Sequence, residues 1–126
     1  MKVGITIPVY LSSDVLLDFT KQTLESISSQ DHEISVYLIV NYSLPEFYPE
    51  KENFNLHESI KEFHVLANPK GNEVGAAWNL GTKMALEAGN EFVAVMNNDL
   101  VLHHKCIDNL VAFADQHQEF VLWTAS

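Results

Sequence analysis

The sequence from Phe92 to Asp99 reads Phe-Val-Ala-Val-Met-Asn-Asn-Asp. Its first five residues are apolar and rich in β-favouring types, and the run is too short for a helix, so it predicts a buried strand over 92–96. Three polar residues, Asn97, Asn98 and Asp99, end the run abruptly. Open α/β sheets bind their ligands at the carboxyl ends of strands, which makes Asp99 the first candidate site residue.

The composition limits the kinds of partner. The chain has 126 residues, 47% of them hydrophobic and 10% aromatic, as expected for one globular domain over residues 1–126. Seven basic residues against 17 acidic ones give a net charge of −10, which argues against nucleic acid or an anionic membrane as the main partner. An anionic ligand would therefore need a bridging cation.

Cysteine usage and the N-terminal residues bear on localisation. Cys106 is the single cysteine, so no internal disulfide is possible, and we expect a reducing, cytoplasmic setting. The apolar run Val3 to Val9 is too short for a secretion signal or a transmembrane segment, so we expect neither.

Apolar runs alternate with helical patterns along the whole chain. Strands are predicted over 3–9, 34–40, 63–67, 92–96 and 120–124, and helices over about 12–30, 56–63, 76–88 and around Ile107 to Ala114. This order predicts an α/β fold, a Rossmann-like, mostly parallel sheet with flanking helices.

Parallel strands place their carboxyl ends on one edge, where Pro8 to Tyr10, Asn41 to Ser43 and Asn97 to Asp99 should converge. No Gly-x-Gly-x-x-Gly or Walker motif is present, which disfavours dinucleotide dehydrogenases and P-loop enzymes. A response regulator would need acidic residues at the end of the first strand, and Pro8-Val9-Tyr10 supplies none. From the residues alone, Asn-Asn-Asp also suits a plain polar turn.

Five short motifs occur in order over almost the whole chain. They are Ile7-Pro8-Val9-Tyr10, Leu24-Glu25-Ser26-Ile27 with Gln30, Val40-Asn41, Gly75-Ala-Ala-Trp-Asn79-Leu-Gly81 and Met96-Asn97-Asn98-Asp99. Together they resemble the family 2 glycosyltransferases of GT-A fold, and the Asn-Asn-Asp variant of the Asp-x-Asp motif is similar to that of rhamnosyltransferase-like members.

The resemblance implies an inverting glycosyltransferase that uses a UDP- or dTDP-linked sugar in surface polysaccharide or glycoconjugate synthesis. It implies that Asp99 binds Mg²⁺ or Mn²⁺, which stabilises the charge on the leaving diphosphate. The nucleotide-sugar-binding residues would be Pro8, Val9, Tyr10, Asn41, Asn79, Asn97 and Asn98.

The chain departs from the family at several points. Asn41 replaces an acidic residue, although an amide can still bind a pyrimidine edge. Tyr42 would either stack on the base or be a surface aromatic, and Lys70 is a conceivable phosphate contact. His103 and His104 would either bind a metal or simply lead into the next helix.

The resemblance ends near Ser126, whereas family members continue into an acceptor-binding half that carries the general base. We therefore expect a GT-A domain that lacks its acceptor half, and the catalytic base is unknown. Exposed apolar surface would then favour a homo-oligomer or a partner subunit. Two other functions stay open, a noncatalytic nucleotide or nucleotide-sugar binding module and, more weakly, a nucleotidyltransferase.

Overall fold

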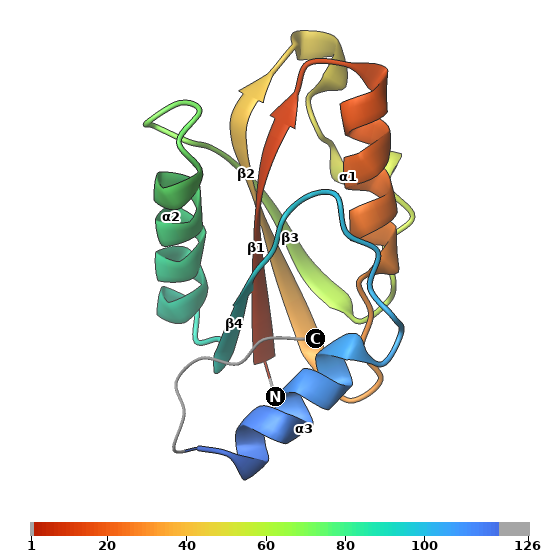
Figure 1. The fold of residues 1–126 in the computed structure, drawn as a ribbon, viewed down its shortest axis with the longest axis vertical. Coiled ribbons are helices and arrows are strands. Elements are labelled where there is room, and N and C mark those ends of the chain that lie inside the picture. Colours follow the sequence, from red (N-terminus) through yellow and green to blue (C-terminus); the bar gives the residue numbers. More distant parts are fainter. Residues whose placement is uncertain (1, 119–126) are drawn as a thin grey trace.

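A computed structural model describes residues 2–118 as a parallel sheet covered by helices on both faces (Figure 1). The strands are β1 (Lys2–Leu11), β2 (Glu33–Ser43), β3 (Ile60–Ala67) and β4 (Phe92–Val95), in the order β3-β2-β1-β4. Each neighbouring pair is parallel, which confirms the predicted α/β class.

Three helices cover the sheet. α2 (Val74–Glu87) lies on one face, while α1 (Asp14–Ser26) and α3 (Cys106–Gln116) lie on the other side (Figure 1). The Ser13 side chain caps α1 by accepting a hydrogen bond from the Leu16 N–H group. Within the described residues, none of the helices has the length and apolar character needed to cross a membrane.

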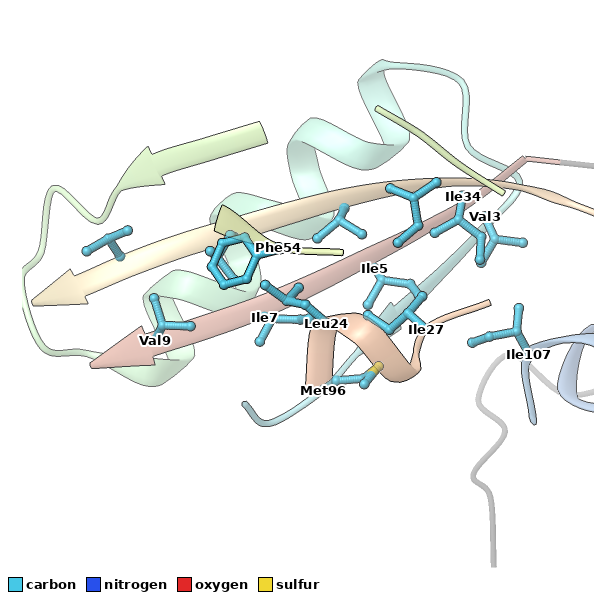
Figure 2. Packing of buried hydrophobic residues seen from close by; sticks show 14 of the residues in the cluster. Val3, Ile5, Ile7, Val9, Leu24, Ile27, Ile34, Phe54, Met96 and Ile107 are labelled. Atoms are coloured by element: carbon cyan, nitrogen blue, oxygen red, sulfur yellow. The ribbon is translucent and has the colours of Figure 1, made fainter. Parts of the chain in front are cut away.

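The larger core lies between the sheet and α1. Alternate residues of β1, among them Val3, Ile5 and Ile7, pack against Leu24 and Ile27 (Figure 2). The opposite face of the sheet packs on α2 in a second cluster, formed by Tyr37, Ile39, Ala77 and Ala85 with partly buried neighbours. Because both faces are covered, β1 and β2 are buried along most of their length.

The α2 helix approaches β1 unusually closely. A Cβ atom added at Gly81 would lie 1.6 Å from Thr6 Oγ1, and one added at Gly4 would lie 2.8 Å from the Ala85 Cβ. Only residues without a side chain fit at these two points. The two glycines therefore set the distance of α2 from the sheet.

The predicted helix over 56–63 is wrong. The Asn55 N–H group donates to the Glu25 carboxylate of α1 at 2.9 Å, and the chain turns at residues 58–59 and enters β3 at Ile60. The backbone at Asn55 is thus held by α1, and residues 60–63 belong to the sheet instead of a helix.

Smaller differences concern element boundaries. β1 and β2 run to Leu11 and Ser43, beyond their predicted ends, and α1 ends at Ser26 instead of residue 30. The segment between β2 and β3 contains two 3-10 helices, η1 (Pro45–Phe47) and η2 (Lys51–Asn53). β3 begins three residues before the predicted start, and β4 ends one residue early. The predicted strand over 120–124 lies outside the described residues.

Candidate functional site

The carboxyl ends of β1, β2 and β4 point to one edge of the sheet, because the strands are parallel. β4 is much the shortest, since Val95 is paired with Thr6, whereas β1 continues to Leu11. The four residue steps from Thr6 to Tyr10 span about 13 Å along the strand, and β4 lies two strands, or about 10 Å, from β2. The edge is therefore stepped, with Asn97 to Asp99 on the lower step and Asn41 and Tyr42 on the upper one.

A bulge in β2 lies on the upper step, at Asn41. Val9 is paired with Val40 and Tyr10 with Tyr42, so Asn41 is an extra residue between the two pairs. Bulges commonly re-aim a side chain at the end of a strand. The Asn41 side chain is turned toward the end of β3, where its Oδ1 atom accepts a hydrogen bond from Asn68 Nδ2 at 2.7 Å.

Asn68 is a site residue that the sequence analysis missed. Its Nδ2 atom also donates to the Glu73 carbonyl at 3.0 Å, and its Oδ1 atom accepts from the Lys70 N–H group at 3.0 Å. It is 7% exposed and holds the loop between β3 and α2 against the end of β2. The signal in the sequence was an asparagine directly after a strand and before Pro69. Since Asn68 holds the Asn41 oxygen, the Asn41 NH₂ group is the part that suits a ligand carbonyl.

Tyr10 and Tyr42 form an aromatic pair on the upper step. Their ring centroids are 4.9 Å apart and their planes differ by 27°, so the rings are stacked. The two residues are 41% and 42% exposed. Tyr42 was predicted to be either a base-stacking residue or a surface aromatic, and its observed ring partner is Tyr10. A planar heterocycle would extend this stack.

The three polar residues after β4 differ in direction. Asn98 Nδ2 donates to Thr20 Oγ1 of α1 at 3.1 Å, so the Asn98 side chain faces the helix. Asn97 and Asp99 are exposed. Asp99 thus lies at the carboxyl edge with its carboxylate available to solvent.

The residues at the lower step suit a divalent cation of the hard type. Among residues 2–118, no group of three or more His, Cys, Asp or Glu side chains could hold a metal ion by itself. Mg²⁺ differs from metals that need such a cage, because it usually binds one or two carboxylates and takes its other ligands from water and substrate phosphates. Asp99 and the Asn97 amide, two residues before it, offer oxygen atoms of the type that such a cation binds.

The other predicted site residues are more dispersed. The Val9 side chain is 1% exposed and belongs to the core, and Pro8 is also buried, so only their backbones are suited to ligand contact. Asn79 is exposed on α2 and is not grouped with the strand ends, since the sheet-facing residues of α2 are Ala77, Gly81 and Ala85. Lys70 is exposed in the loop that Asn68 organises.

The two adjacent histidines lie in the segment before α3. The ring centroids of His103 and His104 are 4.2 Å apart, and both residues are exposed. His103 Nδ1 accepts a hydrogen bond from the Lys105 N–H group at 3.2 Å. This contact fits the predicted lead into the helix.

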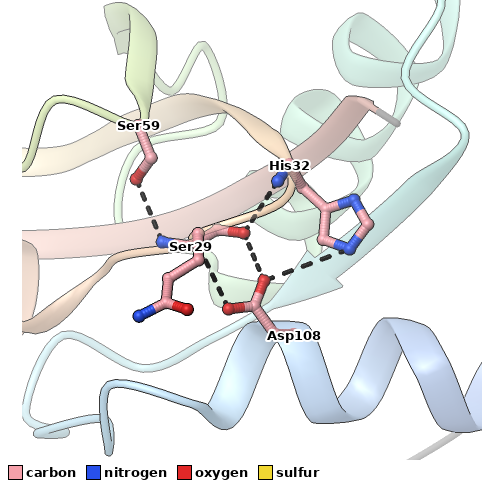
Figure 3. A network of polar contacts seen from close by, with 5 residues as sticks. Ser29, His32, Ser59 and Asp108 are labelled. Carbon is pink, nitrogen blue, oxygen red and sulfur yellow. Dashed lines mark hydrogen bonds and ion pairs between the residues drawn. The ribbon is translucent and has the colours of Figure 1, made fainter.

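Asp108 lies at the other end of the sheet, where α3 meets the loop before β2. It binds the Ser29 hydroxyl and the Gln30 N–H group, and it lies 4.0 Å from His32 Nε2 (Figure 3). Burial acts to raise the pKa of this carboxyl, but hydrogen bonds from Ser29, Gln30 and Asp31 and the nearby His32 outweigh it and lower the pKa below its ordinary value of 3.8. Asp108 is thus an anchor for α3, distant from the stepped edge.

The chain matches a protein family and is similar to solved structures. The sequence model of glycosyl transferase family 2 matches residues 5–125. The crystal structure of S. aureus TarS 1-349 in complex with UDP is similar, with a TM-score of 0.61 and 21% identity over 94% of this chain. The structure of S. aureus TarS 1-349 gives a TM-score of 0.60 and 20% identity, also over 94% of this chain. The matched region is 33% of each TarS chain. The curated proteins give no match.

Proposed function

Since the chain belongs to glycosyl transferase family 2, we propose that its stepped edge binds the nucleotide-diphosphate sugar donor together with a divalent cation. The observation that carries the proposal is the position of Asp99, exposed after β4 on the edge that also holds Asn41 and the Tyr10–Tyr42 pair. The two steps are separated both along and across the strands. Such an edge suits a long ligand with a base at one end and phosphates at the other.

The base belongs on the upper step. The stacked rings of Tyr10 and Tyr42 offer an aromatic surface, and the NH₂ group of Asn41 is directed by its bond to Asn68. An amide donor suits a pyrimidine carbonyl, as in UDP or dTDP. TarS was crystallised with UDP, which supports a uridine nucleotide as the first choice.

The diphosphate belongs on the lower step. Asp99, with the Asn97 amide two residues before it, would hold Mg²⁺ or Mn²⁺, and that cation would neutralise charge on the leaving diphosphate. The protein itself has a net charge of −10 and would otherwise repel a diphosphate. Asn98 is not needed as a ligand, because its side chain binds α1.

Sugar transfer itself needs a general base to accept the proton of the acceptor. None of the described residues is assigned that role, and loss of general-base help alone typically lowers rates by ~10²–10⁴-fold. We therefore propose donor binding by this chain, with inverting transfer by the chain alone slow or undetectable. The proposed setting is cytoplasmic synthesis of a surface polysaccharide or glycoconjugate, and a homo-oligomer or partner subunit stays a prediction.

Titration calorimetry tests donor binding. UDP and dTDP are titrated with Mn²⁺, with Mg²⁺ and with EDTA, and binding heat is expected only when a cation is present. Heat that survives chelation contradicts the cation-bridged mode. Detectable turnover of the sugar conjugate at high enzyme concentration would exclude the noncatalytic binding module.

A further inference from the structure

Three hydroxyl groups along one side of α1 contact the segment that follows β4. Thr20 Oγ1 accepts from Asn98 Nδ2 at 3.1 Å, Thr23 Oγ1 from the Leu100 N–H group at 2.9 Å, and Ser26 Oγ from the Leu102 N–H group at 2.9 Å. The acceptors are three residues apart on the helix, and the donors are two residues apart on the segment. We call this set of Thr20, Thr23 and Ser26 the hydroxyl ladder.

The direction of these bonds follows from the helix. Thr20 donates its own proton to the Leu16 carbonyl at 3.2 Å, and Thr23 donates to the Phe19 carbonyl at 3.1 Å. Ser26 does the same to the Thr23 carbonyl at 2.7 Å. A hydroxyl has a single proton to donate, so each is left with lone pairs that face the segment. The ladder is therefore a row of acceptors, and the segment supplies the Asn98 side-chain NH₂ group and the Leu100 and Leu102 N–H groups as donors.

The bonds of the ladder begin just after the last sheet-type hydrogen bond of β4. The last described sheet-type bond of this region runs from the Met96 N–H group to the Thr6 carbonyl at 3.0 Å. Beyond it, Asn98, Leu100 and Leu102 bind α1, and residues 98–99 form a bend. Asp99 is exposed at this bend, between the bonds that Asn98 and Leu100 make to the helix. Loss of either bond would free the bend from α1 on that side of Asp99.

The ladder lies mostly in a buried position, so its hydrogen bonds are costly to lose. Thr20 and Thr23 are 0% and 1% exposed, so a segment N–H group that lost its acceptor there would be left with poor access to water. Ser26 is only partly buried and contributes the least protected contact. The two threonines therefore hold the segment against α1 on both sides of Asp99.

We propose that Thr20 and Thr23 are positioning residues for the donor site, which act by holding the bend at Asp99 against α1 on both sides of this residue. The proposal rests on the proposed function for its ligand, but the ladder can also be tested without one. A merely stabilising contact would lower the melting temperature when removed and leave cation-dependent nucleotide affinity unchanged.

The test compares Thr23→Val with Thr23→Ser, which keeps the hydroxyl, and with Thr82→Val on α2 as the control for removal of a hydroxyl elsewhere. Hydrogen exchange by NMR reports on the Leu100 and Leu102 N–H groups in the free protein. Titration with UDP and Mn²⁺ reports on the site. Thr23→Val is expected to speed Leu100 exchange at least ~10-fold and to weaken Mn²⁺-dependent UDP binding by ~10–100-fold, as for other groups that orient a metal ligand. Thr23→Ser should restore both, and Thr82→Val should change neither.

The outcomes distinguish the positioning role of Thr23 from the proposed donor binding. If the unmodified protein binds UDP with Mn²⁺ and Thr23→Val binds it equally well, the positioning role is overturned and the proposed function stands. If the unmodified protein does not bind, the proposed function fails, and unchanged Leu100 exchange in Thr23→Val would overturn the ladder as well. Should Thr23→Val not fold, Ser26→Ala replaces it. Faster Leu102 exchange with weaker binding then supports the ladder, and unchanged exchange overturns it.

Discussion

Gly81 of α2 lies against Thr6 of β1 so closely that a Cβ atom on residue 81 would be 1.6 Å from the threonine Oγ1. Thr6 is fully buried in the middle of the sheet, and its Cβ would lie 2.6 Å from the added atom, so rotation of the hydroxyl would not relieve the clash. This contact fixes the distance between α2 and the strand that carries Pro8 and Tyr10.

Gly81→Ala is therefore expected to destabilise the fold. Alanine favours helices over glycine by about 1 kcal/mol, but overpacking a well-packed core costs about 1–3 kcal/mol or more, so a net loss is expected. Gly75→Ala is the matched control in the same helix, because a Cβ there meets nothing within 4 Å. Urea unfolding should show a lower midpoint for Gly81→Ala and an equal or higher one for Gly75→Ala. Equal midpoints for all three proteins would show that α2 is free to shift.

Asn68→Ala should loosen the upper step. The substitution removes the bonds from Nδ2 to Asn41 and Glu73 and the bond accepted from Lys70, and it leaves partners without their hydrogen bonds. Loss of a buried hydrogen-bonding group costs about 1–3 kcal/mol. Asn72→Ala, exposed in the same loop, is the control. We expect a lower unfolding free energy and weaker UDP binding for Asn68→Ala only, and retention of both would contradict the role assigned to Asn68.

Tyr42→Ala tests the aromatic pair. Stacking of a base on an aromatic side chain is typically worth about 1–3 kcal/mol by alanine substitution, so UDP binding should weaken by ~5–100-fold. Tyr42→Phe should bind nearly as well as the unmodified protein, because the ring stays. Tyr48→Ala, 44% exposed on the nearby loop, controls for loss of a surface tyrosine. If calorimetry gives the same affinity for all variants, the base does not lie on this pair.

The Asp108 network predicts a defined pH dependence of stability. Because the pKa of Asp108 is lowered in the folded state, its stabilising contribution is present above pH 3.8 and is lost as the pH falls through the lower, folded-state value. Asp108→Asn should therefore narrow the stability difference between pH 6 and pH 3, with a loss at pH 6 of about 1–3 kcal/mol. Asp115→Asn, exposed on the same helix, should keep the normal profile. Parallel pH profiles for all three proteins would rule out the assigned anchor role.

The sequence predicted the strands of the sheet and the edge that carries the polar residues, because those features depend on local apolar runs and on the parallel order of elements. The helix over 56–63 was wrong because the Asn55 N–H group binds Glu25, 30 residues away, which no local pattern reveals.

The finer site geometry was hidden for the same reason. The bulge at Asn41 depends on the register of β1 against β2, and the bond from Asn98 to Thr20 joins residues 78 positions apart. Asn98 was predicted as a ligand-binding residue from its place in a motif, whereas its side chain faces α1. Spacing within a motif does not say which of its members face outward.

The proposed site brings a cation and a nucleotide together at Asp99. The sharpest test adds trace Mn²⁺ with saturating UDP to ¹⁵N-labelled protein and records which backbone signals broaden. We expect broadening centred on Asn97 to Asp99 that disappears in Asp99→Ala and persists in Asp115→Ala. Broadening centred on Ser29 and Asp108, or broadening at the stepped edge that survives Asp99→Ala, would overturn the Asp99 site.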